Sequence, residues 1–279
     1  MKPVLVVLGR GEVPYDTPVL HANDLGVVRG DGVFETLNVR GGRPWLLDEH
    51  LARMARSAQR LELPLPSRDE LVQLAEQACA SWPADVEGAL RLVCTRGRET
   101  GGPVTCYATL NPISPQILRM RREGIRILTA SLGFAAEARK AAPWLLGGAK
   151  SLSYAVNMAS QRWAANQGYD DVLWVSADGY ALEGPTSTLV WLSGDELCTV
   201  PTDTGILAGT TARFLLDHAA ERGWRAAERM VRPAELETTD GAWLVSSARG
   251  IAAIREIDGR KLPESPHDAA LRSLAGFPN

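Results

Sequence analysis

The sequence predicts an α+β fold built from two domains. Strand and helix patterns are mixed along the chain without a regular strand–helix–strand alternation, which argues against a doubly wound parallel sheet. A length of 279 residues fits one large or two medium-sized domains. Near the middle, the proline-rich stretch Asn111–Pro115 interrupts the apolar periodicity. We therefore expect a small N-terminal domain over residues 1–115 and a larger C-terminal domain over residues 116–279.

The composition is that of a folded protein without a basic excess. Hydrophobic residues make up 45% of the chain and charged residues 23%, both ordinary fractions. The 30 Lys and Arg are balanced by 33 Asp and Glu, whereas nucleic-acid-binding domains usually carry a surplus of basic residues. Apolar runs such as Pro3–Gly9 and Ala141–Ala149 are much shorter than the roughly 20 residues of a membrane span. We expect neither nucleic acid nor a membrane as a partner.

The cysteines and histidines form no recognisable metal-binding motif. The four cysteines contain no CxxC pair, and the four histidines make no HExxH motif. We interpret Cys79, Cys94, Cys106 and Cys198 as buried, small apolar residues. Since these motifs are missing, we expect no bound metal. Because the cysteine pattern fits a reducing compartment and the first residues do not resemble a signal peptide, we expect a cytoplasmic protein.

A strand, a hairpin and a helix are expected at the start of the first domain. Pro3–Leu8 is a short apolar strand. Gly32–Val39 and Pro44–Leu47 flank a diglycine, a pattern typical of a β-hairpin. Asp48 is expected to cap a helix that runs to about Leu61, since apolar residues recur on one face of this segment.

A second helix and a strand pair complete the first domain. Ser67–Glu70 has the sequence of a capping box, which predicts a helix to about Ser81. Ala89–Thr95 and Val104–Leu110 are expected to pair as strands.

The second domain is expected to mix short strands with two longer helices. The helices span about Tyr154–Asn166 and Thr210–Arg222, the latter ended by Gly223. The predicted strands are Ile125–Ser131, Asp171–Ser176, Tyr180–Glu183, Thr188–Leu192 and Trp243–Ser246, and Ile257–Arg260 resembles a hairpin tip.

Two residues of this domain have the chemistry of a carbonyl-cofactor site. Lys150 follows Gly147, Gly148 and Ala149, so its surroundings are small, and a desolvated lysine can form a Schiff base with a carbonyl. Glu183 precedes a Gly-Pro turn, and a carboxylate there can keep a heterocyclic nitrogen protonated. Taken alone, each has a simpler interpretation, as a surface lysine on a loop and as a glutamate flanking a turn.

Two further segments have features of an anion site. Gly205–Arg213 is a glycine-bounded turn that opens a helix, where backbone amides attract phosphate. Ser246 and Ser247 follow the end of a predicted strand. The simpler alternatives are N-capping by Thr210 or Thr211 and an ordinary turn.

Taken together, the order and spacing of these motifs resemble the fold-type IV pyridoxal-phosphate enzymes. This class IV aminotransferase family contains branched-chain aminotransferases, D-amino-acid aminotransferases and 4-amino-4-deoxychorismate lyases. The resemblance covers roughly residues 15–260 and is carried by Arg29–Thr36, His50–Arg53, Thr95–Gly97, Lys150–Tyr154, Glu183–Ser187, Gly205–Thr211 and Ser246–Ala248. It implies a mixed, barrel-like sheet in the larger, cofactor-binding domain, pyridoxal 5'-phosphate (PLP) as cofactor, and a homodimer.

The resemblance also implies a role for individual residues. Lys150 would carry the cofactor covalently and move the reacting proton, and Glu183 would pair with the pyridine nitrogen. The cofactor would further be bound by Arg53 and by Thr210, Thr211 and Ser247 at its phosphate, by Tyr154 at its ring hydroxyl, and by Leu207 on its ring face. Arg96, with Arg29 or Arg91, would face substrate carboxylates. His21 and His50 are interpreted as structural residues.

Within this family the chain is most similar to the bacterial 4-amino-4-deoxychorismate lyases. The supporting segments are His21–Leu25, Val28–Gly32, Lys150–Asn157 and Leu244–Ser247. The resemblance implies formation of 4-aminobenzoate and pyruvate from a small-molecule substrate in folate biosynthesis. The alternatives are an aminotransferase acting on D-amino or branched-chain amino acids, and a non-catalytic binding protein, which an intact Lys150, Glu183 and Arg53 disfavour.

Overall fold

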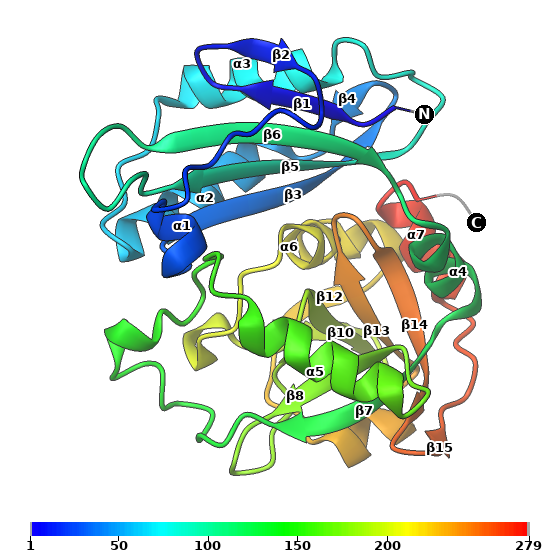
Figure 1. The fold of residues 1–279 in the computed structure, drawn as a ribbon. Coiled ribbons are helices and arrows are strands. Elements are labelled where there is room, and N and C mark those ends of the chain that lie inside the picture. Colours follow the sequence, from blue (N-terminus) through cyan, green and yellow to red (C-terminus); the bar gives the residue numbers. More distant parts are fainter. Residues whose placement is uncertain (1, 278–279) are drawn as a thin grey trace. The chain divides into compact units, whose positions relative to one another are not determined.

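A computed structural model describes residues 2–277, which divide into two compact units. Of the described residues, the first unit comprises 2–114 together with 149–154. The second unit comprises residues 115–148 and 155–277. Each unit has its own β-sheet and helices (Figure 1). This mixture of helices with mainly antiparallel strands confirms the predicted α+β class.

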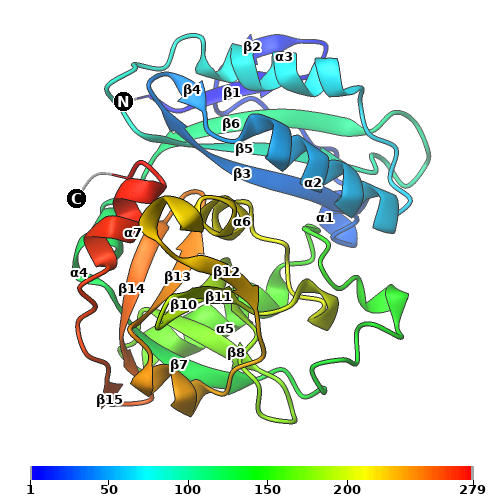
Figure 2. The same ribbon diagram turned by 180° about the vertical axis from the view of Figure 1, so that it is seen from behind.

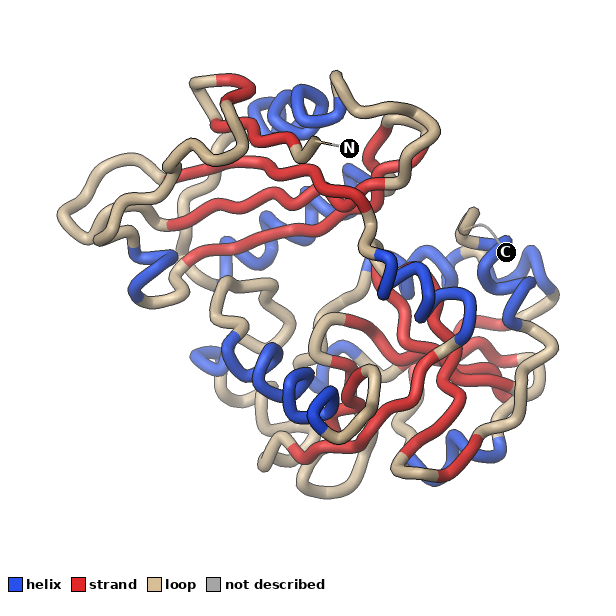
Figure 3. The backbone as a smooth tube through the Cα atoms, turned by 45° about the vertical axis from the view of Figure 1, so that its right-hand side comes forward, coloured by secondary structure: helices blue, strands red, loops and turns tan. Residues whose placement is uncertain are grey.

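The first unit is built on a six-stranded antiparallel sheet with the order β2-β1-β6-β5-β3-β4. The strands are β1 (Val4–Val7), β2 (Gly11–Val13), β3 (Gly32–Arg40), β4 (Arg43–Pro44), β5 (Gly88–Thr95) and β6 (Thr105–Pro112). The long strands β3, β5 and β6 run side by side, as Figure 3 shows. The predicted hairpin and the predicted strand pair are both confirmed.

Two long helices cover one face of this sheet. The helices of the unit are α1 (Leu25–Val28), α2 (Leu47–Arg60) and α3 (Arg68–Cys79). Figure 2 shows α2 and α3 lying across the same face, where α2 contacts β3 and α3 contacts β1 and β6. The apolar core between them includes Val33, Leu37, Leu51, Met54 and Leu74.

The two helix starts differ from each other in how they are capped. The capping box of α3 is confirmed, because Ser67 and Glu70 bond reciprocally. The predicted cap of α2 is wrong: Leu46 is the N-cap residue, in a left-handed conformation, and Asp48 lies in the first turn. The turn after β4 starts the helix two residues earlier than the sequence indicated, and the Asp48 carboxylate pairs with Arg68 instead.

The predicted burial of the four cysteines is confirmed, but two of them are not simple apolar residues. Cys94 and Cys106 are joined in a disulfide, whereas Cys79 and Cys198 are free and buried. The pairing is cross-strand, because Cys94 and Cys106 are directly opposite each other on β5 and β6. Their separation of 12 residues gave no motif that would mark them.

The second unit contains a mixed sheet of nine strands. Its main path is β12-β11-β10-β13-β14-β7-β8; β9 pairs with β10 and β15 with β14. The strands are β7 (Ile125–Ser131), β8 (Asp171–Val175), β9 (Glu183–Gly184), β10 (Ser187–Ser193), β11 (Glu196–Thr199), β12 (Arg225–Glu228), β13 (Gly241–Ser246), β14 (Gly250–Ile257) and β15 (Arg260–Lys261). The pairs β11–β12, β14–β7 and β7–β8 are parallel, and the other pairs are antiparallel.

Four α-helices pack around this sheet. They are α4 (Pro115–Glu123), α5 (Ala155–Asn166), α6 (Thr210–Asp217) and α7 (Asp268–Leu274). Helix α5 contacts β7 and β8, α4 and α7 contact β14, and α6 contacts β10 to β13. The predicted helix Thr210–Arg222 is interrupted at His218, after which Ala219–Arg222 form a 3-10 helix ended by Gly223. None of the helices in residues 2–277 is long and apolar enough to cross a membrane.

Candidate active site

Lys150 lies in a short segment that extends the edge of β3. The amide of Phe34 donates to the carbonyl oxygen of Lys150 (3.1 Å), and the amide of Leu152 donates to that of Gly32 (2.9 Å). On its other side, the Lys150 amide donates to the hydroxyl of Ser57 on α2 (3.0 Å). These bonds hold the backbone of Lys150 from two elements and account for the place of residues 149–154 in the first unit.

The side chain of Lys150 lies against two aromatic rings. Its amine is 4.4 Å from the ring centre of Phe34, 5.4 Å from that of Tyr154, and donates to the Tyr154 hydroxyl at 3.2 Å. The two rings meet edge to face at 4.9 Å. Since only 8% of Lys150 is exposed, it is not a surface lysine on a loop.

Arg53 is buried on the inner face of α2. Its guanidinium donates to both carboxylate oxygens of Glu35, from Nε at 2.8 Å and from Nη2 at 2.6 Å. Glu35 also contacts Nδ1 of His50 at 2.7 Å. The Ser57 hydroxyl donates to the carbonyl oxygen of Arg53 (3.0 Å), so one serine connects this helix turn to Lys150. The sequence singled out neither Ser57 nor Glu35.

The three arginines predicted for the substrate have different surroundings. Arg96 donates to the Asp31 carboxylate (2.6 and 3.1 Å) and to the carbonyl oxygens of Leu61 and Glu62. The hydrogen bond to Asp31, opposed by desolvation, raises the pKa of Arg96. Arg29 is exposed, and its guanidinium donates to the adjacent carbonyl oxygen of Val28. The contacts of Arg96 therefore join the loop at Asp31 to the end of α2.

Arg91 lies on the face of the sheet that carries Phe34. Its guanidinium carbon is 5.9 Å from the ring centre of Phe34. In the register of β5 and β6, Arg91 is opposite Thr109, and Val93 is opposite Tyr107. Burial raises the pKa of the Tyr107 hydroxyl, and the charge of Arg91 opposes this rise. The ring of Phe34 thus lies near both the amine of Lys150 and the guanidinium of Arg91, all within the first unit.

In the second unit, Glu183 is fixed by a main-chain amide. The carboxylate accepts a hydrogen bond from the amide of Leu207 (3.1 Å), and only 8% of the residue is exposed. Glu183 is paired with Thr188 in the register of β9 and β10, and Thr188 is paired with Val245 of β13. Because Ser247 follows two residues after Val245, this register brings the end of β13 to the same edge as Glu183.

The start of α6 has the properties of an anion site. Its N-cap residue, Gly209, offers no side-chain cap to the first amides of the helix. Gly209 lies so close to Thr188 that a Cβ atom would overlap the threonine hydroxyl. The hydroxyl of Thr211 is buried and has no hydrogen-bond partner among the described residues. A helix N-terminus without a side-chain cap, together with a buried hydroxyl that has no partner among the described residues, suits a negatively charged group.

Arg139 is a further polar residue near Glu183 that the sequence did not single out. Its Nη1 donates to the carbonyl oxygen of Gly205 (2.8 Å), which also accepts from the amide of Gly148. Desolvation lowers the pKa of Arg139, and the negative charge of Glu183 opposes this shift. Arg139 binds the carbonyl oxygen of Gly205, and Glu183 binds the amide of Leu207, so the segment 205–207 links the two side chains.

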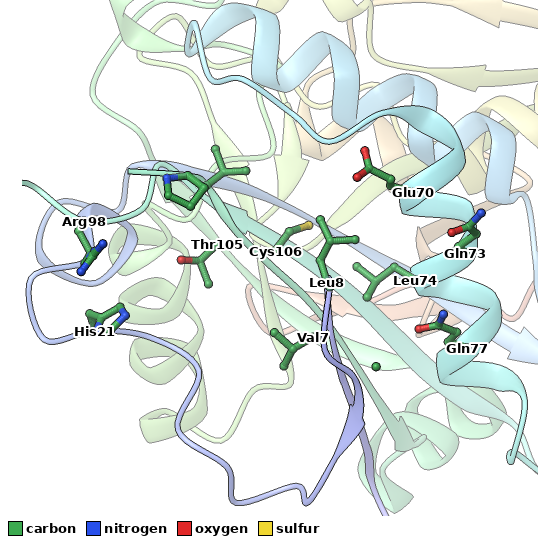
Figure 4. A pocket seen from close by; sticks show the side chains of 14 residues that line it. Val7, Leu8, His21, Glu70, Gln73, Leu74, Gln77, Arg98, Thr105 and Cys106 are labelled. Atoms are coloured by element: carbon green, nitrogen blue, oxygen red, sulfur yellow. The ribbon is translucent and has the colours of Figure 1, made fainter. Parts of the chain in front are cut away.

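The first unit also contains a cavity of about 670 Å³ in a different place. It lies between α3 and the strands β1 and β6 (Figure 4), with Leu8, Leu74 and Cys106 in its middle. His21 and Arg98 lie at one end, and polar side chains of α3 at the other. Lys150 and Tyr154 do not line this cavity but lie in the segment along β3. We therefore do not assign the cavity to the site of Lys150.

Comparison with known proteins supplies the family. The family model "Amino-transferase class IV" matches residues 32–257, which is most of the chain. The protein belongs to the class IV aminotransferase family. Among curated relatives of this class IV protein, the bifunctional aminodeoxychorismate lyase/D-amino acid transaminase of Mycobacterium tuberculosis is 45% identical over 258 residues, covering 89% of each chain. The aminodeoxychorismate lyase of Bacillus subtilis is 28% identical, over 86% of this chain and 82% of that protein.

Similar solved structures belong to the same fold type and identify the cofactor. A hypothetical aminotransferase from Mycobacterium tuberculosis in its PLP-bound form has a TM-score of 0.94 at 42% identity, over 98% of this chain and 97% of that chain. A fold IV-transaminase from Curtobacterium pusillum has a TM-score of 0.92 at 36% identity, over 99% and 100%. The class IV protein described here thus has fold type IV and uses PLP. The buried amine of Lys150 and the unused hydroxyl of Thr211 fit an aldehyde and a phosphate, respectively.

Proposed function

We propose that this class IV enzyme converts 4-amino-4-deoxychorismate to 4-aminobenzoate and pyruvate, a step of folate biosynthesis. The observation that carries the proposal is the 45% identity to a relative named for this lyase activity, over 89% of both chains. A second relative named for the lyase alone, at 28% identity, supports the same activity. The buried amine of Lys150 and the anchored carboxylate of Glu183 are the side chains that this chemistry needs.

We assign the cofactor-binding roles as the family resemblance implies. Lys150 carries the cofactor, Tyr154 contacts its ring hydroxyl, and Glu183 pairs with the ring nitrogen, which it keeps protonated. Leu207 packs on the ring, and its amide orients Glu183. The phosphate is assigned to Arg53, Thr210, Thr211 and Ser247, a combination of one cation, helix amides and hydroxyls.

The reaction needs proton movement but neither an oxidant nor water. When bound, PLP supplies a carbonyl for the substrate amine and a ring that accepts the electron pair released at carbon. The Lys150 amine takes the proton from the ring carbon that bears the amino group. The ring C–O bond then breaks, the ring becomes aromatic, and the departing enolpyruvate takes up a proton to become pyruvate. The two products contain all atoms of the substrate.

The substrate carboxylates need cationic partners. We propose Arg91 for one of them, because its guanidinium lies on the same sheet face as Phe34, the ring that contacts Lys150. Arg29 is exposed and is our second candidate. Arg96 is already bound to Asp31 and two carbonyl oxygens, so we assign it the role of holding the loop around Asp31.

D-amino-acid transamination is the second candidate activity. The Mycobacterium tuberculosis relative is named for both activities, and a D-alanine aminotransferase from Bacillus licheniformis is 29% identical over 86% of this chain. Lys150 and Glu183 serve both reactions, so cofactor residues alone do not separate them. Branched-chain aminotransferases are also relatives, at 28% identity or below in the examples from Methanocaldococcus jannaschii and Rickettsia conorii.

A paired assay on one preparation tests these activities. The first reaction contains 4-amino-4-deoxychorismate, with 4-aminobenzoate and pyruvate measured. The second contains D-alanine or a branched-chain amino acid with 2-oxoglutarate, with glutamate measured. We expect 4-aminobenzoate at the higher rate. A preparation that binds PLP and transaminates but forms no 4-aminobenzoate would overturn the lyase proposal.

The Lys150→Ala variant tests the assignment of the reacting amine. We expect both activities to fall by at least about 10³-fold, because the proton-transfer group is lost. Borohydride treatment of the wild-type protein, followed by peptide mass analysis, should find the cofactor mass on Lys150. Cofactor attached to another lysine would contradict the assignment.

We further propose that the enzyme acts as a homodimer in the cytoplasm. Large apolar side chains are exposed in both units, among them Val27 (58%), Trp144 (75%) and Val156 (63%). Such side chains are usually covered in an assembly when they form a patch. Light scattering of the purified protein should give twice the chain mass, and a monomeric mass would contradict the proposal.

A further inference from the structure

A carboxylate interrupts the apolar row of β3 that faces α2. Along this strand Val33, Leu37 and Val39 are completely buried in the core of the first unit. Glu35 occupies the position between Val33 and Leu37 in the same alternation and is also 0% exposed. A charged group in such a row is costly unless it is paired, so its partners should reveal why it is there.

The partners of Glu35 both come from one face of α2. Arg53 uses the Nε–Nη2 edge of its planar guanidinium for the two carboxylate oxygens, at 2.8 and 2.6 Å. His50, one turn earlier, contacts the second oxygen at 2.7 Å. An ionised carboxylate only accepts hydrogen bonds, so the hydrogen at this contact lies on Nδ1 of the histidine.

Glu35 remains ionised and His50 remains neutral in this cluster. Burial alone would raise the pKa of Glu35, but the charge and hydrogen bonds of Arg53, with the hydrogen bond of His50, lower it to about 2. Burial lowers the pKa of His50, and its hydrogen bond to Glu35 opposes this shift. The cluster is therefore one arginine cation paired with one carboxylate, braced by a neutral imidazole.

We propose that Glu35 is a positioning residue for Arg53, and that His50 holds Glu35 in place, so that the guanidinium has a fixed orientation in which it would bind the phosphate of the cofactor. This inference rests on the proposed role of Arg53. A free arginine side chain has many rotamers, and the two-point contact with Glu35 selects one of them. Ordering before binding lowers the entropic cost of capturing the phosphate.

A purely structural role for the pair makes a different prediction. A buried ion pair contributes little to stability compared with an apolar replacement, but removing one partner leaves the other charge unpaired. A structural Glu35 would therefore affect folding and the binding of any cofactor form to the same extent. A positioning Glu35 affects only ligands that carry the phosphate.

The experiment compares PLP with pyridoxal, which lacks the phosphate. Dissociation constants of both are measured by visible absorbance for apoprotein of the wild type, Glu35→Gln and Asp24→Asn. Asp24 is a matched control, since it is a fully buried carboxylate of the same unit that accepts from Thr95 and Thr105. We expect Glu35→Gln to reduce the preference for PLP over pyridoxal by about tenfold or more, and Asp24→Asn to keep the wild-type preference.

Each outcome separates this inference from the proposed function. A wild-type protein that binds neither ligand would overturn the proposed function itself. A wild type that prefers PLP, together with a Glu35→Gln variant of equal preference, would overturn the positioning role alone. If Glu35→Gln does not fold, Glu35→Asp is measured instead; its carboxylate is one methylene shorter, and the same loss of preference is expected because it no longer reaches both guanidinium nitrogens.

Discussion

The groups that we propose for the cofactor phosphate differ in kind between the two units. In the first unit the cationic group is a side chain, Arg53, held by another buried side chain, Glu35. In the second unit the groups proposed for the phosphate are the amides at the start of α6 and the buried hydroxyl of Thr211, while the Leu207 amide donates to Glu183. In the first unit the positive charge of Arg53 depends on the orientation given by Glu35. In the second unit the amide dipoles at the start of α6 depend on the backbone conformation.

This difference determines which substitutions should matter in each unit. Replacing a side chain in the first unit changes a formal charge or its orientation. Most side-chain replacements in the second unit leave the amides of Leu207 and α6 in place. Glu183 and Thr211 are the exceptions in the second unit, and their substitutions should have the two largest effects there.

Among substitutions in the second unit, Glu183→Gln should lower the activity most. The glutamine side chain lacks the negative charge that favours protonation of the ring nitrogen. Its carbonyl oxygen can still accept a hydrogen bond from the backbone amide of Leu207. We expect kcat to fall by about 10²- to 10³-fold, the scale of losing one preorganised electrostatic group at a reacting centre. Steady-state kinetics of the lyase and transaminase reactions measure this. Glu221→Gln, an exposed glutamate of the same unit, is the control; equal rates for both variants would refute the role.

Thr211→Val should weaken the cofactor without harming the empty protein. The Thr211 hydroxyl is buried with no partner among the described residues, so its removal relieves an unsatisfied group. If it donates to phosphate, the dissociation constant of PLP should rise roughly tenfold or more. The apoprotein should keep or slightly raise its Tm.

The matched control for Thr211 is a buried threonine that does have a partner. The hydroxyl of Thr199 donates to the carbonyl oxygen of Leu189 at 2.7 Å. Thr199→Val should therefore lower the Tm of the apoprotein and leave the PLP affinity unchanged. Reversal of this contrast, with Thr211→Val the less stable apoprotein, would mean that the Thr211 hydroxyl supports the fold.

Sequence patterns predicted those elements whose signal is complete within one segment. The strand Ile125–Ser131 and the capping box at Ser67 are where the pattern put them. The strand β12 was missed because Arg225–Glu228 has a charged residue at each end and no apolar run, and β11 because Glu196–Thr199 is only four residues long. Helix α4 was missed because the prolines around Ile113 resemble a linker, although Pro115 is acceptable in the first turn of a helix.

The candidate site was predictable where residue identity carries the chemistry. Lys150 and Glu183 were singled out from a distinctive motif order, but their neighbours are set by tertiary contacts. Ser57 lies 93 residues from Lys150, and no periodicity connects a helix serine to a distant amide. Glu35 did have a signal, because it is a carboxylate in an alternating apolar row, and such a residue needs a buried partner.

Ser57→Ala should affect the first unit more than the size of the change suggests. The substitution leaves the amide of Lys150 without its acceptor in a buried place. An unsatisfied buried donor costs about 1–3 kcal/mol, which should appear as lower stability in urea and less cofactor bound at a fixed PLP concentration. Ser153→Ala, in the same segment but exposed, should change stability by less than about 0.5 kcal/mol. Similar losses for the two variants would show that the Ser57 bonds are not important.

The pH dependence of stability should give the smallest effect, and it distinguishes the side-chain cluster from the backbone site. Burial lowers the pKa of His50 in the folded protein, so lowering the pH through 6.5 protonates the unfolded chain first. The stabilising contribution of neutral His50 is present above pH 6.5 and is lost as the pH falls toward its folded pKa. Glu35, whose pKa is lowered to about 2, loses its contribution only as the pH falls from 4.5 toward that value.

Urea unfolding of the wild type and His50→Gln at pH 7.5, 6, 5, 4 and 3 tests this order. The glutamine amide can still donate to Glu35 but does not titrate. We therefore expect the stability of the variant to fall less than that of the wild type between pH 7.5 and 5, and the two to decline in parallel below pH 4.5, where Glu35 titrates in both. Equal slopes between pH 7.5 and 5 would mean that His50 accepts a proton in the folded protein as easily as in the unfolded chain. The imidazole would then not be the neutral brace of Glu35, and the arginine would depend on the carboxylate alone.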